Sequence, residues 1–376
     1  MSLYLIVFLF LIALSVWEYI KGPGKVQYYI ALGVLSFLLV FRYGQGTDYL
    51  SYATIFYEAP KLFDFQQLLT VDLHGEPGWI FICALFRQLG LPFELLAILL
   101  SVLFMWCLHR FIQRYCKYSV IALLLAFPTV YLTYAASALR QAFALFVFLG
   151  FLLPLLEKRK YILYCLITVV CALMHASALV FLAAPVLRFF YLNWRRMAVL
   201  SVLAAVVGFL LSKLMFYVPQ LNYYSYSTPS VLAIGERCIS TAVIIFAFWE
   251  YLSTKSEKRP ENKAVSLLLQ IYLLSTLIYL FFWWNALISS RFCVYFKAVE
   301  IALFALAIKS GGKRALAVAC YCLALCVVLY YKNIGSYISQ GNYYDFVNVF
   351  NYPWISIFNK ERILDYCNIV SERIFQ

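Results

Sequence analysis

Charged residues are scarce in this sequence. Asp, Glu, Lys and Arg make up 12% of its 376 residues, whereas 65% are hydrophobic and the mean hydropathy is +0.85. A soluble domain carries about 25% charged residues, and its interior is too small to bury this much apolar side chain. The composition excludes a water-soluble fold. It also argues against nucleic acid as the partner of the +13 net charge, because Lys and Arg in a membrane protein first mark cytoplasmic loops.

Familiar catalytic motifs are also missing. No DxD, HExxH, GxSxG or Walker pattern occurs, and the eleven cysteines include no CxxC pair. Cys320 and Cys322 would point to different faces of a helix and form a poor metal clip. We therefore predict structural thiols, no metal and no cofactor. Soluble-type nucleotide-sugar transfer, zinc hydrolysis, a serine nucleophile elbow and ATP-driven pumping have no support.

Apolar blocks recur at the length that crosses a bilayer as a helix, about 17–25 residues. The fold class that we predict is all-α, a polytopic transmembrane helix bundle at 1–332 with an interfacial tail at 333–376. A shorter apolar run at 77–89 is expected to be tilted or re-entrant. The twelve expected spans are 2–20, 27–43, 92–112, 118–135, 138–156, 161–175, 176–192, 197–217, 232–251, 264–284, 291–309 and 315–331.

The loops separate by charge into two faces. Six short loops hold 18 of the 30 Lys and Arg residues, and the positive-inside rule places them in the cytoplasm. The acidic loop 44–75 falls on the opposite face, together with the loop 218–236. The first span lacks a basic n-region and a small-residue cleavage site, which favours a retained helix over a signal peptide. The basic loops are 21–25, 109–117, 157–160, 188–196, 252–263 and 309–314.

Polar residues at the outer end of the second span form the first candidate cluster. An ionisable side chain at membrane depth is costly and by default marks a cavity, a pair or a pathway. Arg42 can bind phosphate or carboxylate through its planar fork, and Asp48 is a candidate base or a partner for Arg42. Tyr49 and Tyr52 follow, with two glycines that allow backbone approach. The alternative is an arginine that snorkels beside an aromatic belt.

Two further candidates lie near helix starts. Glu76 precedes Pro77, so it either caps a helix or lies in an outward-facing cavity where burial raises its pKa towards that of a general base. Arg140, followed by Gln141, lies in the apolar stretch 118–156, which contains no acidic residue. We therefore expect Arg140 to hold a bound anion rather than to form a structural salt bridge.

The remaining candidates are a histidine and two arginines. His175 lies at a predicted outer turn, where it could act as a hydrogen-bond donor or proton carrier; a satisfied core histidine is the alternative. Arg291 lies at a predicted helix start, which is unfavourable for a cation unless an anion binds there. Arg237 is similar, but Glu236 beside it is a possible partner.

These residues are all expected on the non-cytoplasmic side. Several arginines around one cavity imply an anionic ligand with more than one charge, such as a pyrophosphate. The carboxylates and the histidine add acid–base capacity. The binding candidates are Arg42, Tyr49, Tyr52, Arg140, Gln141, Arg237 and Arg291, and the catalytic candidates are Asp48, Glu76 and His175.

Five short motifs occur in an order that resembles a known family. They are RYGQGTDYLSY, EPGW, SALRQAFALFVFLGF, MHASALV and SSRF. As a set, spread over about residues 41–295, they are similar to the EpsG/Wzy-type polysaccharide polymerases of bacterial surface-glycan assembly. The resemblance implies a GT-C-like, metal-independent glycosyltransferase in the bacterial inner membrane. Its active site would face the periplasm.

The resemblance also implies a reaction. Such enzymes transfer a growing glycan from undecaprenyl pyrophosphate to a new lipid-linked repeat unit, as in O-antigen and lipopolysaccharide biosynthesis, often with a co-polymerase that sets chain length. On this basis Arg140 and Arg291, helped by Arg42, would neutralise the pyrophosphate leaving group. Tyr49 and Tyr52 would stack on sugar rings.

The acid–base assignment follows from the same resemblance. A carboxylate would take the proton of the acceptor hydroxyl, with Glu76 slightly ahead of Asp48, and His175 would orient the substrate. Two alternatives remain: a related O-antigen ligase, which uses the same donor, and a flippase or transporter of lipid-linked glycans. No internal repeat of the kind common in transporters is visible, and the polar candidates cluster near one face, which favours an enzyme.

Overall fold

The computed structural model describes residues 1–64, 75–187, 193–215, 230–254, 263–309 and 311–368. Across these ranges the secondary structure is helical, and extended pairing is limited to two isolated bridges. The predicted all-α fold is confirmed. The loops 44–75 and 218–236 lie partly outside the described residues. The chain divides into two compact units: the first comprises Met1–Phe151, Val169–Ala176 and Tyr321–Gln376, and the second comprises Leu152–Thr168 and Ser177–Cys320.

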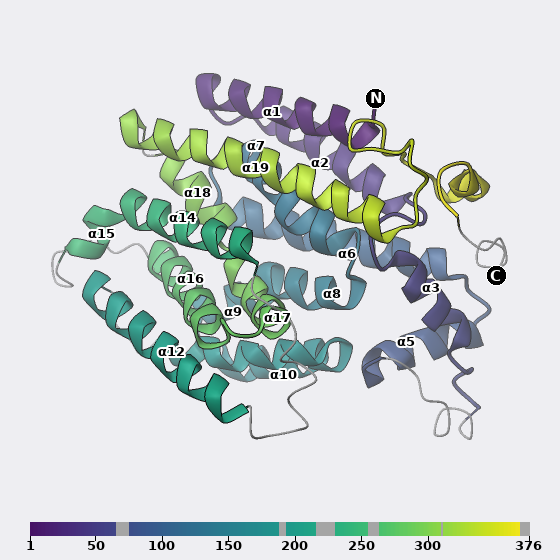
Figure 1. Cartoon of the computed structure of the whole chain (residues 1–376), viewed down its shortest axis with the longest axis horizontal. Coiled ribbons are helices and arrows are strands. Elements are labelled where there is room, and N and C mark those ends of the chain that lie inside the picture. Colours follow the sequence, from purple (N-terminus) through teal and green to yellow (C-terminus); the bar gives the residue numbers. More distant parts are fainter. Residues whose placement is uncertain (65–74, 188–192, 216–229, 255–262, 310, 369–376) are drawn as a thin grey trace. The chain divides into compact units, whose positions relative to one another are not determined.

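Helices make up most of the described residues of both units (Figure 1). Those assigned here are α1 (Leu3–Lys21), α2 (Lys25–Val40), α3 (Tyr49–Glu58), α5 (Pro77–Gln88), α6 (Phe93–Tyr115), α7 (Ser119–Ala126), α8 (Leu139–Val147), α9 (Leu153–Glu157), α10 (Tyr161–Met174), α11 (Ala184–Leu187), α12 (Trp194–Met215), α14 (Val231–Ala247), α15 (Trp249–Ser253), α16 (Lys263–Phe281), α17 (Ala286–Lys297), α18 (Glu300–Lys309) and α19 (Gly312–Gln340). The π-helical segments are Phe127–Ala135 and Phe148–Leu152, and the 3₁₀ segments are Ala176–Ala183 and Ile357–Asp365.

Among the described residues, six helical stretches are long and apolar enough to cross a membrane. Shorter apolar helices accompany them, as expected of a multi-pass membrane protein, but this number does not confirm the twelve predicted spans. The six stretches are Leu3–Lys21, Phe93–Tyr115, Leu139–Glu157, Trp194–Lys213, Lys263–Phe281 and Gly312–Gln340, and the shorter helices are Lys25–Val40, Ser119–Ala135, Tyr161–Met174 and Ala176–Leu187.

The first unit is built on apolar contacts between α1 and α7, α2 and α6, and α6 and α8. On α1, Tyr4, Phe8 and Leu11 are buried, and the Phe8 ring stacks on Tyr330 of α19 at a centroid distance of 4.6 Å. Such buried aromatic pairs add about 0.5–1.5 kcal/mol beyond their area burial. The packing therefore joins the first and last long helices of the chain.

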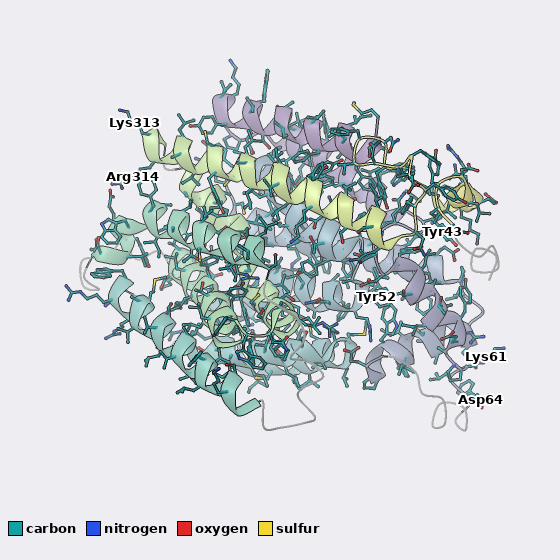
Figure 2. The ribbon with its side chains drawn as sticks, in the orientation of Figure 1. Tyr43, Tyr52, Lys61, Asp64, Lys313 and Arg314 are labelled. Carbon is teal, nitrogen blue, oxygen red and sulfur yellow. The ribbon has the colours of Figure 1, made fainter. Side chains whose placement is uncertain are left out.

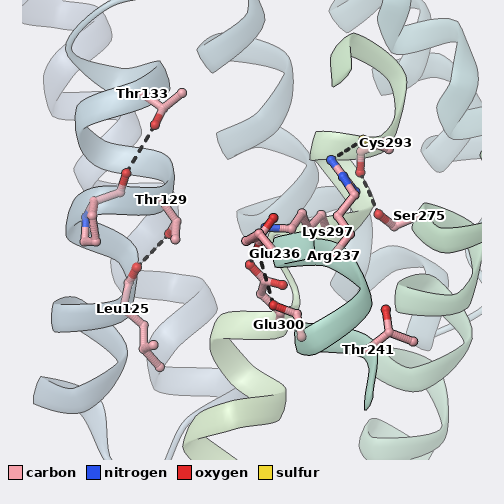
Figure 3. A network of polar contacts seen from close by, with 12 residues as sticks. Leu125, Thr129, Thr133, Glu236, Arg237, Thr241, Ser275, Cys293, Lys297 and Glu300 are labelled. Carbon is pink, nitrogen blue, oxygen red and sulfur yellow. Dashed lines mark hydrogen bonds and ion pairs between the residues drawn. The ribbon is translucent and has the colours of Figure 1, made fainter. Parts of the chain in front are cut away.

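Proline interrupts the helix that follows α7, as its position in the sequence predicts. The ring of Pro128 removes one backbone donor and crowds the preceding turn, and the helix widens into the π-helical segment that begins at Phe127. Thr133 Oγ1 donates to the Pro128 carbonyl at 3.2 Å (Figure 3). Asn333 Nδ2 donates to the same carbonyl at 2.6 Å. These side chains add donors at the Pro128 carbonyl. The carbonyl that loses its donor to the proline is that of Leu124, and Cys326 Sγ lies 3.7 Å from it.

The residues after α19 fold back across the first unit. The α19 helix continues to Gln340, so the tail begins later than the predicted residue 333. Segment 353–357, here called the strap, pairs with the chain that precedes α3: Tyr43 N donates to Ile355 O at 2.8 Å, and Ile357 N donates to Phe41 O at 3.0 Å. Gln45 Nε2 donates to the strap at Pro353 O (3.1 Å). The strap supplies backbone partners to a loop that has no other strand beside it among the described residues.

The second unit is organised around α16, which contacts α12, α17 and α18. Gly208 of α12 lies so close to α16 that an added Cβ would come within 2.3 Å of the Phe281 carbonyl oxygen. The predicted span 291–309 is wrong: the chain forms α17 and α18 with a break between Lys297 and Glu300. A salt bridge joins these two residues at 2.9 Å, and it places a charged pair where a continuous span would be apolar.

Candidate active site

Glu76 joins two other predicted site residues within the first unit. Its Oε2 accepts a hydrogen bond from Arg140 Nη1 at 2.5 Å, and its Oε1 lies 2.8 Å from His175 Nδ1. The backbone N–H of Ala176 donates to Oε1 at 3.1 Å. Residues 64 and 99 positions apart in sequence therefore meet at one carboxylate. We call Glu76, Arg140 and His175 the triad.

Three local structures present these side chains. Pro77 occupies the first turn of α5, where its missing N–H costs nothing, and Glu76 precedes it as the N-cap residue. The carboxylate makes no capping hydrogen bond to its own helix, so the capping interpretation of Glu76 is not supported. Arg140 lies in the first turn of α8, and His175 follows the end of α10.

The charge of Glu76 is fixed by these contacts. Burial opposes ionisation, but hydrogen bonds from His175 and from the N–H of Ala176, together with the positive charge of Arg140, outweigh it and lower the pKa of Glu76 to about 2. The expectation from the sequence had the opposite sign, because it counted burial and not the partners. Likewise, the expectation that Arg140 forms no salt bridge is wrong, since its acid comes from outside the stretch 118–156.

The ionised carboxylate determines the tautomer of His175. A carboxylate only accepts hydrogen bonds, so the ring must donate from Nδ1, which leaves Nε2 as the nitrogen that can accept in the neutral ring. That Nε2 is buried and has no hydrogen-bond partner among the described residues. The same holds for Arg140 Nε. Because buried polar atoms are nearly always paired, these two mark a place where a ligand group fits.

Aromatic rings form one wall beside the triad. Tyr52 of α3 (labelled in Figure 2) packs edge-on against Trp79 of α5 at 5.3 Å, and the Arg140 guanidinium lies 5.5 Å from the centre of the Tyr52 ring. A cation over an aromatic face gains about 0.5–2 kcal/mol. Burial raises the pKa of Tyr52, partly offset by Arg140. Tyr52 thus stays protonated and orients the arginine.

Acid should weaken the folded state through Glu76. A group whose pKa is lowered on folding stabilises the protein above its unfolded pKa, here about 4.5, and loses that contribution as the pH falls towards about 2. Thermal unfolding in detergent should therefore show stability falling from about pH 5 downward by up to about 3 kcal/mol. Glu76→Gln should be less stable at neutral pH and lack this part of the acid dependence. An unchanged pH profile in the variant would contradict the assignment.

Close contact between α5 and the end of α10 brings Glu76 to His175. A Cβ on Gly78 would come 2.7 Å from the carbonyl oxygen of Leu173, which is backbone and cannot yield cheaply. Gly78→Ala should therefore separate the two segments, destabilise the protein by about 1–3 kcal/mol and reduce activity. The matched control is Gly33→Ala, an open position on α2, which should be neutral or stabilising by about 1 kcal/mol. Equal melting curves for both variants would rule out this role of Gly78.

Arg42 lies elsewhere in the first unit and is buried, with 2% exposure. Its guanidinium donates to the carbonyls of Leu39, Ala135 and Ala136 and to Ser101 Oγ, at 2.5–3.4 Å. These acceptors are all neutral, and Tyr49 lies against the guanidinium at 5.5 Å. The arrangement holds two helix ends together, and it offers no open face of Arg42 to a pyrophosphate.

The loop after Arg42 is held against the turn that precedes α8. Gly46 has φ +100°, and a Cβ there would lie 2.4 Å from the Ala136 carbonyl oxygen, so only glycine fits. Thr47 N and Oγ1 both contact Ser137 Oγ, at 2.7 and 2.5 Å. The loop between α2 and α3 thereby fixes the start of α8, which carries Arg140.

The other predicted residues of this unit have different environments. Tyr49 is fully buried and Tyr52 is 7% exposed, so sugar stacking on Tyr49 is not supported. Asp48 precedes α3, is half-buried and makes no capping hydrogen bond; it does not pair with Arg42. Gln141 lies next to Arg140 in the first turn of α8.

Arg237 and Arg291 belong to the second unit. Arg291 lies in the middle of α17, whose N-cap is Asn285, so it does not lie at a helix start and the dipole argument for an anion there fails. Its pyrophosphate contact stays a prediction. Arg237 donates to Cys293 Sγ at 2.8 Å and lies 4.2 Å from the centre of the Tyr279 ring. Glu236, which the sequence offered as a partner of Arg237, pairs instead with Lys297, with 2.7 Å between Glu236 Oε1 and Lys297 Nζ.

Sequence reasoning missed several partners. Ser101 accepts from Arg42, Trp79 supports Tyr52, and Glu300 shares Lys297 with Glu236. Lys297 is not among the residues predicted for the site, yet its side chain is only 13% exposed and pairs with two carboxylates. The spacing Lys297 to Glu300 was the available signal, since residues three apart share a helix face.

The fold and the triad define a helical, multi-pass type of protein with a charged site on one unit. Comparison with family models assigns the chain more narrowly. The EpsG family model matches residues 25–349, which include the triad, the loop between α2 and α3, and α17. The chain belongs to the EpsG family, which indicates a membrane glycosyltransferase-type polymerase. No curated protein and no solved structure matches the chain.

Proposed function

We propose that this protein is a polysaccharide polymerase of the bacterial inner membrane. It transfers a growing surface glycan from undecaprenyl pyrophosphate to a lipid-linked repeat unit on the periplasmic side. Family membership supports the reaction class. The observation that carries the proposal is the triad, in which one carboxylate holds a cation and an imidazole at 2.5 and 2.8 Å. The triad thereby places a cation for the charge of the leaving group next to a group that can take the proton of the acceptor.

The triad suggests roles that differ from those inferred from the sequence. A base works best when its pKa lies near the working pH, and a carboxylate with a pKa of about 2 is a weak base. Glu76 holds Nδ1 of His175, so Nε2 is the ring nitrogen left to face an acceptor hydroxyl. A carboxylate that fixes a histidine tautomer is a recurring device in general-base catalysis. We therefore assign the base to His175 and the orienting role to Glu76.

The reaction then proceeds with balanced proton and charge. The acceptor hydroxyl gives its proton to His175 Nε2, and its oxygen bonds to the anomeric carbon of the donor. The bond from that carbon to the pyrophosphate oxygen breaks, and undecaprenyl pyrophosphate leaves with the electron pair. Arg140, which keeps 21% exposure, stabilises the negative charge that develops on the leaving oxygen.

The test is glycan laddering in a polymerase-deficient host. Wild type should restore a ladder, whereas Arg140→Ala should leave single repeats at equal expression. If wild type restores only the attachment of preformed glycan, the protein is a ligase. If it restores only export, it is a flippase or transporter. If Arg140→Ala ladders normally, the triad is not the polymerisation site.

A further inference from the structure

A cavity lies within the second unit, between α12, α14 and α16. Its volume is about 580 Å³, within the range of about 300–1,000 Å³ typical of small-ligand sites. The cavity is part of the second unit, whereas the triad belongs to the first. Its lining includes Ala205, Ile234, Arg237, Thr241, Tyr279 and Leu280.

Among the described residues that line this cavity, Arg237 is the cationic side chain. The guanidinium lies between Cys293 Sγ, at 2.8 Å, and the face of the Tyr279 ring, as drawn in Figure 3 for Cys293. Both of these contacts are neutral. A planar guanidinium has five N–H donors and binds oxyanions through two of them at once, so Arg237 can hold an anionic group at the cavity wall.

The acidic residues near Arg237 are engaged by another cation. Lys297 Nζ donates to Glu236 Oε1 at 2.7 Å and to Glu300 Oε1 at 2.9 Å, and Ser240 Oγ also donates to Glu236 at 3.2 Å (Figure 3). These three side chains are 4–19% exposed. Lys297 is thus engaged by carboxylates, and Arg237 is the cation that lines the cavity. A ligand with one negative charge therefore suits this site better than a pyrophosphate, which needs several cations.

Hydroxyl groups on the cavity wall are turned to partners within the protein. Thr241 Oγ1 pairs with Tyr272 OH at 3.2 Å, Ser275 Oγ donates to the Cys293 carbonyl at 3.1 Å, and Thr276 Oγ1 donates to the Tyr272 carbonyl at 3.3 Å. Their methyl and methylene groups remain for contact. The wall is therefore largely apolar around one arginine, which does not match a sugar.

One wall of the cavity belongs to a helix with an exposed apolar surface. On α12, Val202, Val206 and Leu210 are 50–62% exposed, and the helix is long and apolar enough to cross a membrane. Apolar side chains on such a helix face lipid. A lipid chain lying along α12 can thus enter the cavity without leaving an apolar environment.

We propose that this cavity binds an anionic phospholipid of the bilayer, with the phosphate on Arg237 and an acyl chain along α12. Basic pockets between transmembrane helices bind anionic lipid headgroups in this way. The proposal is independent of the transferase reaction. It assigns Arg237 to a resident lipid and removes it from the predicted pyrophosphate set.

The test measures lipid retention by native mass spectrometry of the full chain. The protein is delipidated in detergent and mixed with phosphatidylglycerol or with phosphatidylcholine carrying the same acyl chains. Wild type should retain phosphatidylglycerol preferentially, and Arg237→Gln should lower that retention about tenfold, the effect of losing one charge-assisted contact. Arg314→Gln (Figure 2) is the matched control, because Arg314 is 52% exposed and pairs with Glu250 elsewhere in this unit.

A second variant distinguishes loss of the lipid site from misfolding. Ala205→Phe fills the cavity and leaves Arg237 in place, so it should also lose phosphatidylglycerol while its melting temperature stays near that of wild type. Equal retention of both lipids by wild type, or full retention by both cavity variants, would overturn the proposal. A third measurement adds undecaprenyl phosphate to the protein loaded with phosphatidylglycerol. If undecaprenyl phosphate displaces phosphatidylglycerol and phosphatidylcholine does not, the cavity belongs to the donor lipid instead. Laddering in the host is scored separately, so failure of the lipid proposal leaves the polymerase proposal standing.

Discussion

Replacing His175 by alanine should lower the rate of glycan polymerisation by about 10²–10⁴-fold, the usual contribution of a positioned general base. The substitution removes the Nε2 that takes the acceptor proton and leaves Glu76 paired with Arg140. Donor binding should change little, because the cation of the triad remains. The measurement is the initial rate of repeat addition by purified protein, with the dissociation constant of the donor determined in parallel.

His109→Ala is the matched control for this substitution. His109 also pairs through Nδ1 with a side chain of the first unit, Tyr28 OH at 2.9 Å, but it lies near the C-terminal end of α6, in the stretch 109–117 that the sequence places on the cytoplasmic face. It should polymerise at the wild-type rate. If His175→Ala retains more than about a tenth of the activity, a loss too small for a general base, the base is another group and Glu76 returns as the candidate.

Replacing Arg42 by alanine should prevent stable folding rather than donor binding. Three backbone carbonyls and Ser101 would lose their buried donor, and each unsatisfied buried group costs about 1–3 kcal/mol. We expect a total loss of about 3–5 kcal/mol, the size seen when a buried charged network is broken. Thermal unfolding in detergent and the yield of monodisperse protein measure it.

Lysine should not rescue this position. Its ammonium has three donors at one point, whereas Arg42 reaches carbonyls on two sides of its planar fork. Arg362→Ala is the control, because Arg362 is an exposed residue of the same unit whose described contact is a 3.3 Å hydrogen bond to Tyr366 OH. A folded Arg42→Ala protein with a normal melting temperature and weak donor binding would instead place Arg42 in the pyrophosphate site.

The helical fold could be predicted because apolar length is a direct signal. Runs such as 92–112 correspond closely to Phe93–Tyr115. The break between α17 and α18 could not be predicted from hydropathy, since the surrounding apolar residues average out the charges of Lys297 and Glu300. Lys297 also pairs with Glu236, which lies 61 positions away in the sequence. Hydropathy also stopped the last long helix at 331, although its polar end continues to Gln340.

The sequence indicated which residues lie near one another at the candidate site, but not which of them form hydrogen bonds and ion pairs. Charge sidedness placed Glu76, Arg140 and His175 on one face, and the structure brings these three together. Their pairing depends on how α5, α8 and α10 pack, which no local pattern encodes. The burial of Arg42 and Tyr49 could not be predicted for the same reason: a buried arginine with backbone partners and an arginine over a ligand have the same sequence signature.

The strap has a consequence for the time course of biogenesis. The side-chain amide of Gln45 has its acceptor, the Pro353 carbonyl, only after 308 more residues have been synthesised. The backbone of residues 41–43 has its partners only when the same segment has been made. At about 5–20 residues per second of synthesis, this delay is about 15–60 s. During that interval the first two helices are in the membrane while the loop between α2 and α3 lacks its edge partners. The start of α8, which rests on that loop and carries Arg140, therefore reaches its final setting only when the last part of the chain has emerged.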